Sequence, residues 1–106
     1  MQNILNIPVK WLTEGVTGHY VHGERMTLGL VELKQGSIVP LHSHPHEQIT
    51  FILSGKLQME IGGKTLVLEP NMYHLIPGDV IHSALALTDC SLIDAFQPVR
   101  EDYRTQ

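Results

Sequence analysis

The sequence has few charged residues and almost no cysteine, and each shortage excludes a class of protein. Charged residues make up 17% of the 106 residues while 42% are hydrophobic, a balance that predicts a compact globular chain and excludes a disordered one. Lys and Arg number 7 against 11 Asp and Glu, and the net charge of −4 argues against a nucleic-acid partner. Cys90 is the only cysteine, so no internal disulfide can form, and we expect it to be a small buried apolar residue.

Long apolar runs are also missing. No stretch approaches the roughly 20 apolar residues that a membrane-spanning helix needs. Residues 1–6 contain no basic segment followed by an apolar one, so we expect no signal peptide. A single cysteine suits a reducing compartment. These absences together predict a cytoplasmic protein without membrane contact.

Short runs rich in Val, Ile, Leu and Thr alternate with Gly, Pro and Asp turn signals along the chain. We expect strands near residues 9–13, 26–34, 37–43, 47–54, 56–61, 64–69, 72–76, 80–87 and 91–97. Gly62-Gly63 lies between two alternating runs and predicts a two-residue hairpin, because both glycines tolerate positive φ. No window carries a convincing helical period, so the pattern predicts an all-β sandwich or barrel.

Histidine is the polar residue that the sequence concentrates. His42, His44 and His46 alternate over five residues, and Gln48 follows them. Residues two apart on an extended strand project from the same face, so His42 and His44 are expected to project together from one strand. Several imidazoles on one face pack a core poorly but bind a metal ion well. His82 is the best candidate for a further ligand from a distant strand.

The remaining histidines have weaker claims to a function. His46 could line a pocket, support the ligands through a hydrogen bond or point to solvent. His19 and His22 lie in a segment without a clear strand pattern, where an ordinary surface or edge position is favoured. His74 shares the alternation of Ile76, so we expect it to face inward as a hydrogen-bonded core histidine.

Two segments resemble the two sequence motifs of the cupin family. They are Gly36-x5-His42-x-His44-x3-Gln48-x6-Gly55 and Asn71-x5-Pro77-x-Asp79-x2-His82. Gln48 replaces the usual Glu of the first motif. In the second motif Asn71 and Asp79 stand where Gly is usual, and Ala86 stands where the motif ends in Asn. The resemblance implies that His42, His44, Gln48 and His82 bind a divalent transition metal inside the mouth of a barrel.

The resemblance also implies a fold and a domain organisation. The fold would be a jelly-roll barrel, the double-stranded β-helix of cupins. A length of 106 residues suits one domain, and no linker, repeat or low-complexity segment divides it. We therefore expect a single cupin domain over residues 1–106, with a barrel core at about 26–97, an N-terminal arm at 1–25 and a short tail at 98–106.

The glutamine at the fourth ligand position changes the chemistry expected of the metal. A Glu ligand would cancel one positive charge, whereas the amide oxygen of Gln48 cancels none, so a divalent ion keeps its full charge. This favours binding and Lewis-acid roles over redox cycling, and it attracts an anionic substrate. Imidazole and amide ligands suit Zn, Ni, Fe(II) and Mn alike.

Asp94 lies in an otherwise apolar run near the C-terminus, residues 92–96. An unpaired buried carboxylate is costly, so we expect a partner, and Arg100 could reach back to it. Considered on these residues alone, an Asp94–Arg100 ion pair that anchors the tail is favoured over a functional role.

A closer resemblance favours a functional role for Asp94 and Arg100. The closing segment, residues 94–102, and the segment 44–48 resemble the KdgF-like cupins of pectin and alginate degradation. In that group the residues that match Asp94, Phe96 and Arg100 are catalytic or substrate-site residues. The resemblance implies an enzyme that converts small anionic 4,5-unsaturated uronate sugars to linear 5-keto-4-deoxyuronates.

A shared fold does not fix a function, so other activities stay open. They are a metal-dependent dioxygenase, a sugar isomerase or epimerase, and a non-catalytic module that binds a sugar or metabolite. Small cupins often pair as dimers, so we also expect a homodimer in which residues 4–12 cover an edge of the partner. Trp11 and Tyr20 are candidates for that interface or for the core.

Overall fold

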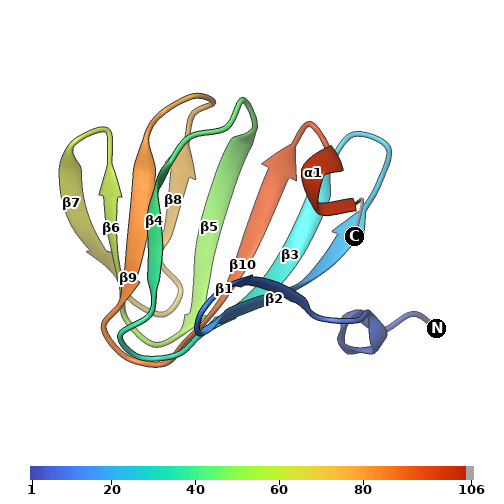
Figure 1. The fold of residues 1–106 in the computed structure, drawn as a ribbon, viewed down its shortest axis with the longest axis horizontal. Helices are drawn as coiled ribbons and strands as arrows, with labels where there is room; N and C mark the ends of the chain where they lie inside the picture. Colours follow the sequence, from blue (N-terminus) through green and yellow to red (C-terminus); the bar gives the residue numbers. More distant parts are fainter. Residues whose placement is uncertain (105–106) are drawn as a thin grey trace.

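The computed structural model describes residues 1–104, and ten strands make up nearly all of its regular structure (Figure 1). The strands are β1 (Lys10–Thr13), β2 (Val16–His22), β3 (Thr27–Leu33), β4 (Ile38–His42), β5 (Glu47–Ser54), β6 (Leu57–Ile61), β7 (Lys64–Leu68), β8 (Tyr73–Ile76), β9 (His82–Ala86) and β10 (Cys90–Gln97). A 3₁₀ turn, η1 (Ile4–Asn6), precedes them and a short helix, α1 (Glu101–Arg104), follows them. Within the described residues, no helix has the length and apolar character to cross a membrane.

The strands form two antiparallel sheets that face each other across the interior (Figure 1). The larger sheet has the strand order β1-β2-β3-β10-β5-β8, and the smaller has the order β4-β9-β6-β7. The chain passes back and forth between the sheets, so strands distant in sequence become neighbours. This all-β arrangement is the jelly-roll barrel that the sequence motifs imply, and the predicted fold class is confirmed.

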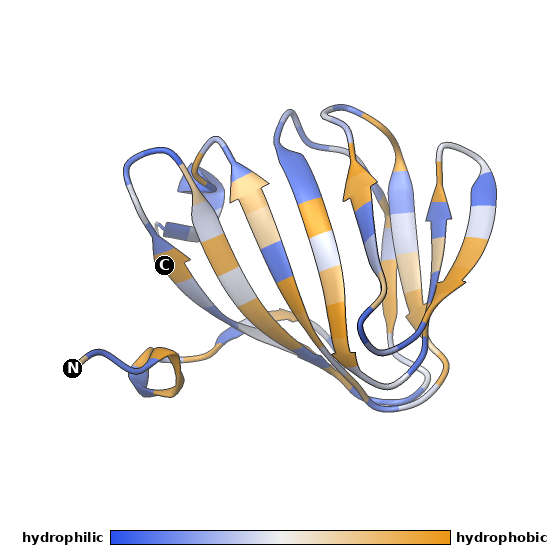
Figure 2. Ribbon diagram, turned by 180° about the vertical axis from the view of Figure 1, so that it is seen from behind, coloured by the Kyte–Doolittle hydropathy of each residue, from blue (hydrophilic) through white to orange (hydrophobic). Residues whose placement is uncertain are grey.

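Strand alternation determines which residues face the interior. In β3, for example, alternate residues are buried, and the hydropathy bands of the larger sheet alternate in Figure 2. The register aligns inward residues into rows, and the deepest rows are apolar: Val16 faces Leu33 across β2 and β3, and Leu92 faces Ile52 across β10 and β5. Val16 and Ile52 are completely buried. The apolar core therefore fills one end of the barrel.

The next rows toward the other end carry polar side chains. One row across five strands contains Tyr20, Gly29, Asp94, Thr50 and His74. The row beyond it contains His22, Thr27, Phe96, Gln48 and Ile76. Because buried polar groups need partners, this end of the barrel is the candidate location of a functional site.

The segment expected as an N-terminal arm, residues 1–25, contains β1 and β2, which are strands of the larger sheet. Gly18 obscured the strand pattern of β2, and its packing partner Gly29 lies on the neighbouring β3. The ring of Tyr20 lies over Gly18 and Gly29, and a Cβ at Gly18 would meet the ring at 2.6 Å. Glycine is poor in strands but necessary where a ring lies flat on the sheet. The segment with His19 and His22 is consequently a strand inside the sheet.

The hairpin prediction is confirmed. Gly62 and Gly63 have φ of 55° and 84° and join β6 to β7, with Ile61 paired to Lys64. Cys90 is buried as expected.

Candidate metal centre

Four side chains from both sheets meet at the polar end of the barrel. Gln48 lies on β5 of the larger sheet, and His42 and His82 lie opposite each other on β4 and β9 of the smaller one. The expectation that His42 and His44 share one strand is wrong, because β4 ends at His42 and His44 lies in the loop before β5. The side chains of His42 and His44 come together because the chain bends after β4, and not because they alternate along one strand.

The three histidines form a compact cluster. One ring nitrogen from each of His42, His44 and His82 lies within 4.8 Å of the others. The ring centroids of His42 and His82 are 4.3 Å apart, and those of His44 and His82 are 4.9 Å apart. Nε2 of His44 is 3.0 Å from Oε1 of Gln48. His44 and His82 are buried, and His42 is more open to solvent. The four residues predicted as ligands are therefore together.

Backbone carbonyls orient all three imidazoles in the same way. In each ring Nδ1 lies within hydrogen-bond distance of a main-chain oxygen. The acceptors are Pro40 for His42 at 2.8 Å, His46 for His44 at 3.1 Å and Val80 for His82 at 2.8 Å. A carbonyl accepts but never donates, so this network assigns the proton of a neutral ring to Nδ1 and leaves Nε2 with a free lone pair.

The four side chains point lone pairs at one another, an arrangement that suits a bound cation better than direct contact among themselves. Nε2 of His82 is buried without a hydrogen-bond partner among residues 1–104. Burial lowers the pKa of His44 to about 4, with Arg100 acting in the same direction, so the ring is neutral near pH 7. Its Nε2 lone pair then faces the carbonyl oxygen of Gln48, another acceptor. Buried acceptors without donors are unfavourable, and a divalent ion among them would satisfy them all.

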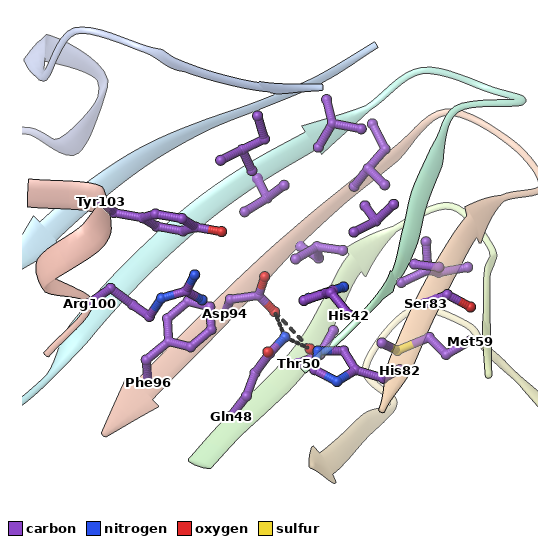
Figure 3. Close-up of a pocket in the computed structure, with 18 of the residues that line it drawn as sticks. His42, Gln48, Thr50, Met59, His82, Ser83, Asp94, Phe96, Arg100 and Tyr103 are labelled. Carbon is purple, nitrogen blue, oxygen red and sulfur yellow. Dashed lines mark hydrogen bonds between the residues drawn. The ribbon is translucent and has the colours of Figure 1, made fainter. Parts of the chain in front are cut away.

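Two acceptors fix the amide of Gln48. Its Nε2 donates to Oγ1 of Thr50 at 2.9 Å and to Oδ1 of Asp94 at 3.1 Å. The hydroxyl of Thr50 donates to the same Asp94 oxygen at 2.7 Å, which completes the triangle drawn in Figure 3. Since the amide nitrogen is engaged by acceptors, Oε1 must point toward the histidines. Asp94 thus orients Gln48, a neutral candidate ligand, by accepting a hydrogen bond from its amide nitrogen.

Asp94 lies beside Gly29 on β3, which has no side chain. The ring of Tyr20, on β2, lies over Gly29 and fills that space. Desolvation raises the pKa of Asp94 to about 6, although hydrogen bonds from Thr50 and Gln48 act to lower it. Within residues 1–104, Oδ2 of Asp94 accepts no hydrogen bond and is available to a molecule in the barrel.

The Asp94–Arg100 ion pair considered from the sequence does not form. Arg100 is buried and binds Asp102 through two bonds, from Nε to Oδ1 at 3.0 Å and from a terminal nitrogen to Oδ2 at 2.8 Å. The guanidinium lies 3.8 Å from the ring centroid of Tyr103 and 4.7 Å from that of Phe96. Helix α1, which has no apolar period long enough to detect, therefore supplies both the acid and the aromatic face that hold Arg100.

These residues line a single cavity of about 70 Å³ inside the barrel. Its polar lining includes His42, His82, Gln48, Asp94 and Arg100, and the apolar side chains of the core close its far end (Figure 3). Sequence reasoning named these five as candidate site residues, and the structure places them around one cavity. Sequence reasoning missed Thr50, which follows Gln48 by two residues on β5 and pairs directly with Asp94 on β10.

The other histidines lie outside the ligand cluster. His46 lies beside the site, with its ring centroid 5.4 Å from that of His44 and 6.3 Å from that of Phe96. His74 is half-buried at the end of the Asp94 row on β8, facing inward as expected. Nδ1 of His19 bonds the carbonyl of Ile7 on the outer side of the sheet.

A second loop holds His44 in place. The backbone N–H of Asp79 donates to the carbonyl of His44 at 2.8 Å, and Gly78 lies so close to Pro45 that a Cβ would meet its carbonyl oxygen at 2.5 Å. Asn71 and Asp79, which replace glycines of the second motif, have φ of 72° and 68°. Asn and Asp adopt this left-handed conformation more readily than other side chains, which explains how the turns survive without glycine.

Replacing Gly78 by alanine is expected to displace the His44 loop, because the new methyl group would collide with the Pro45 carbonyl. We expect metal affinity to fall by about 10-fold, the scale of effects on residues that support ligands. Titration with Zn²⁺ by calorimetry measures this. Gly23→Ala is the matched control, since its Cβ would meet nothing closer than 3.6 Å. Equal affinity in the two variants would show that this loop does not position His44.

Comparison with known proteins agrees with the barrel fold. The family model described as the Cupin domain matches residues 29–96. Over 75 residues the chain is 29% identical to the pectin degradation protein KdgF of Dickeya dadantii (strain 3937), covering 69% of this chain and 68% of that protein.

Solved structures give the same result. KdgF from a Halomonas species superimposes with a TM-score of 0.85 at 26% identity, covering 91% of this chain and 90% of that one. An RmlC-like cupin from Shewanella frigidimarina NCIMB 400 superimposes with a TM-score of 0.90 at 22% identity, covering 97% and 94%, a likeness of fold alone. Because the family model covers well over half of the sequence, the chain belongs to the cupin domain family.

Proposed function

We propose that this cupin is a metal-dependent enzyme that converts 4,5-unsaturated uronate sugars to linear 5-keto-4-deoxyuronates. The observation that carries the proposal is the placement of a carboxylate, Asp94, behind a neutral ligand, Gln48, in the same small cavity as a buried arginine, Arg100. Similarity to two KdgF proteins, one of them named for pectin degradation, supports the same choice of substrate.

Arg100 binds the substrate carboxylate. Asp102 engages one side of the guanidinium, and the aromatic ring of Tyr103 supports its face. The donors not used by Asp102 are free to form charge-assisted hydrogen bonds with an anionic sugar. A planar guanidinium held in this way loses little conformational freedom on binding.

His42, His44, Gln48 and His82 hold the metal ion, which is Zn, Ni, Fe(II) or Mn. Bound there, the ion supplies Lewis-acid attraction for oxygen atoms of the substrate. All four ligands are neutral, so they leave the charge of the ion undiminished for an anion.

Asp94 moves the protons. Its free oxygen gives a proton to C4 of the enol ether, and the resulting carboxylate accepts a proton from the water molecule whose oxygen bonds to C5. The bond between C5 and the ring oxygen then breaks as the ring oxygen takes the proton of the new C5 hydroxyl, which leaves a ketone at C5 and releases C1 as its hydrate. Phe96 forms an apolar wall beside the ring, and no oxidant is consumed.

Direct observation of the substrate tests the proposal. Metal-loaded protein is mixed with an unsaturated uronate monomer, and loss of its ultraviolet absorbance is followed against a protein-free control. We expect an acceleration of at least about 100-fold, the contribution of one positioned acid. Binding without acceleration would indicate a sugar-binding module, and oxygen consumption with aromatic or diketone substrates would indicate a dioxygenase.

Asp102→Asn is expected to raise the KM for the uronate by about 10-fold with a smaller change in kcat, because the variant loses the charge that orients Arg100. Steady-state kinetics on the metal-loaded variant measures both constants. Glu101→Gln on the same helix is the control, since Glu101 contacts only the exposed Arg104 side chain. If both variants behave like the unmodified protein, Asp102 does not position Arg100.

A further inference from the structure

Tyr103 on helix α1 packs its ring against the core of the barrel. It lines the same cavity as Asp94 and Arg100, and Figure 3 shows its hydroxyl group pointing into that cavity. The ring supports the face of Arg100, but a phenylalanine ring could do the same. The hydroxyl group therefore has a position in the cavity that support of Arg100 does not explain.

Three neighbours fix the orientation of this ring. The ring of Tyr20 packs against it with centroids 4.8 Å apart, and the ring of Phe96 lies nearly perpendicular to it at 6.3 Å. The guanidinium of Arg100 lies 3.8 Å from its centroid. A ring held by these contacts loses little freedom when a ligand binds, so its hydroxyl group is preorganised.

The hydroxyl group of Tyr103 has a proton to donate. Burial raises its pKa, so it stays protonated near pH 7 even though Arg100 acts in the opposite direction. Among residues 1–104, the side-chain hydrogen bonds around helix α1 are made by the guanidinium groups of Arg100 and Arg104, and none of them uses this hydroxyl. A guanidinium can only donate, so its approach to the phenol oxygen leaves the O–H free for an acceptor.

The charges beside Tyr103 indicate which acceptor it takes. Arg100 keeps N–H groups that Asp102 does not engage, and its guanidinium lies against the ring that carries the hydroxyl. Nζ of Lys10 is 5.3 Å from the centroid of the same ring. Two cations at this position favour an anionic acceptor over a neutral sugar hydroxyl, and a carboxylate has lone pairs for several donors at once.

Tyr20 is the other tyrosine that lines the cavity, and its hydroxyl is placed differently. A Cβ at Gly18 would be 2.8 Å from that oxygen, and Gly18 pairs with the buried Val31. The Tyr20 hydroxyl therefore lies toward the apolar end of the barrel, whereas that of Tyr103 lies among the polar groups.

We propose that Tyr103 is a further substrate-binding residue, whose hydroxyl donates a hydrogen bond to the same carboxylate that Arg100 binds. The inference rests on the sugar-acid ligand of the proposed function, and not on its reaction. With two kinds of donor on one carboxylate, the cavity selects uronates over neutral sugars.

Binding of D-glucuronate, a uronate without the C4=C5 double bond, tests the inference independently of turnover. Calorimetry on the metal-loaded protein measures its Kd. Tyr103→Phe keeps the ring against Arg100 and removes only the hydroxyl, so we expect the Kd to rise by about 10- to 100-fold, the scale of a hydrogen bond to a charged group. Tyr73→Phe is the matched control, since Tyr73 is 68% exposed on β8 and does not line the cavity.

D-glucuronamide, whose amide carries no charge, is expected to lose less affinity in the Tyr103 variant than D-glucuronate does. Equal Kd values for D-glucuronate in the two variants would overturn the inference. An equal loss for both ligands would overturn it too, because the hydroxyl would then contact another part of the sugar, and so would absence of D-glucuronate binding by the unmodified protein. Binding that depends on Tyr103 in a protein that does not convert the unsaturated uronate would support the carboxylate site and reject only the enzyme.

Discussion

Replacing His82 by alanine is expected to strip the metal ion from this protein, with a loss of affinity greater than about 100-fold. Changes to groups that merely support a ligand cost 10- to 100-fold, and His82 is itself a donor, so its loss should cost more. Among residues 1–104, Nε2 of His82 is buried and has no hydrogen-bond partner. A bound ion would supply that partner, so His82 gives the strongest structural argument for a metal at this position. Elemental analysis after dialysis measures the metal content.

His74→Ala is the appropriate control for this experiment. His74 lies on the inner side of the same barrel and is half-buried, but its ring is not part of the ligand cluster. We expect the His74 variant to keep its metal, and a double variant lacking the rings of His44 and His82 to keep none. A full complement of metal in the double variant would refute the site.

Asp94→Asn is expected to lower kcat/KM for the unsaturated uronate by about 1000-fold while the metal stays bound. Asparagine preserves the shape and can still accept hydrogen bonds from Gln48 and Thr50, so the orientation of the ligand is retained. It cannot donate a carboxyl proton, and general acid–base groups contribute about 100- to 10,000-fold. Absorbance kinetics with elemental analysis on the same sample separates the two properties.

Two outcomes would count against the assignment of Asp94 as the acid. Full activity in the variant would eliminate a proton-transfer role outright. Loss of metal together with activity would reassign Asp94 to orienting Gln48. Asp89→Asn controls for a change of one charge, because Asp89 lies in an exposed turn away from the cavity and its side chain accepts a hydrogen bond from the backbone N–H of Gln35.

The sequence predicted the barrel because strand alternation and turn residues are local signals. Gly62 and Gly63 predicted their hairpin because glycine adopts the positive φ that a two-residue turn needs more readily than other residues do. Strand β2 was missed for an equally physical reason. Gly18 and Gly29 are there to accommodate the ring of Tyr20, a requirement that exists only once the strands are adjacent.

The candidate metal ligands were predictable because histidine is rarely clustered without a cause, and the resemblance to the cupin motifs implied the set with Gln48 and His82. The bend that brings His44 inward was not foreseen. The environment of Arg100 was not predictable. Its partner, Asp102, is two residues away, and the choice between this neighbour and Asp94 depends on where helix α1 folds back.

The main chain orients all three imidazoles. Orientation of the histidines is therefore separate from the shaping of the pocket by side chains. Residues that line the cavity can change without rotating the three histidine rings, because carbonyl oxygens are present whatever the side chain. If the proposed function holds, a descendant of this protein could exchange the uronate for another anion by altering Phe96 or helix α1 alone. The arrangement of the three histidines would be inherited intact, and only the selectivity of the cavity would evolve.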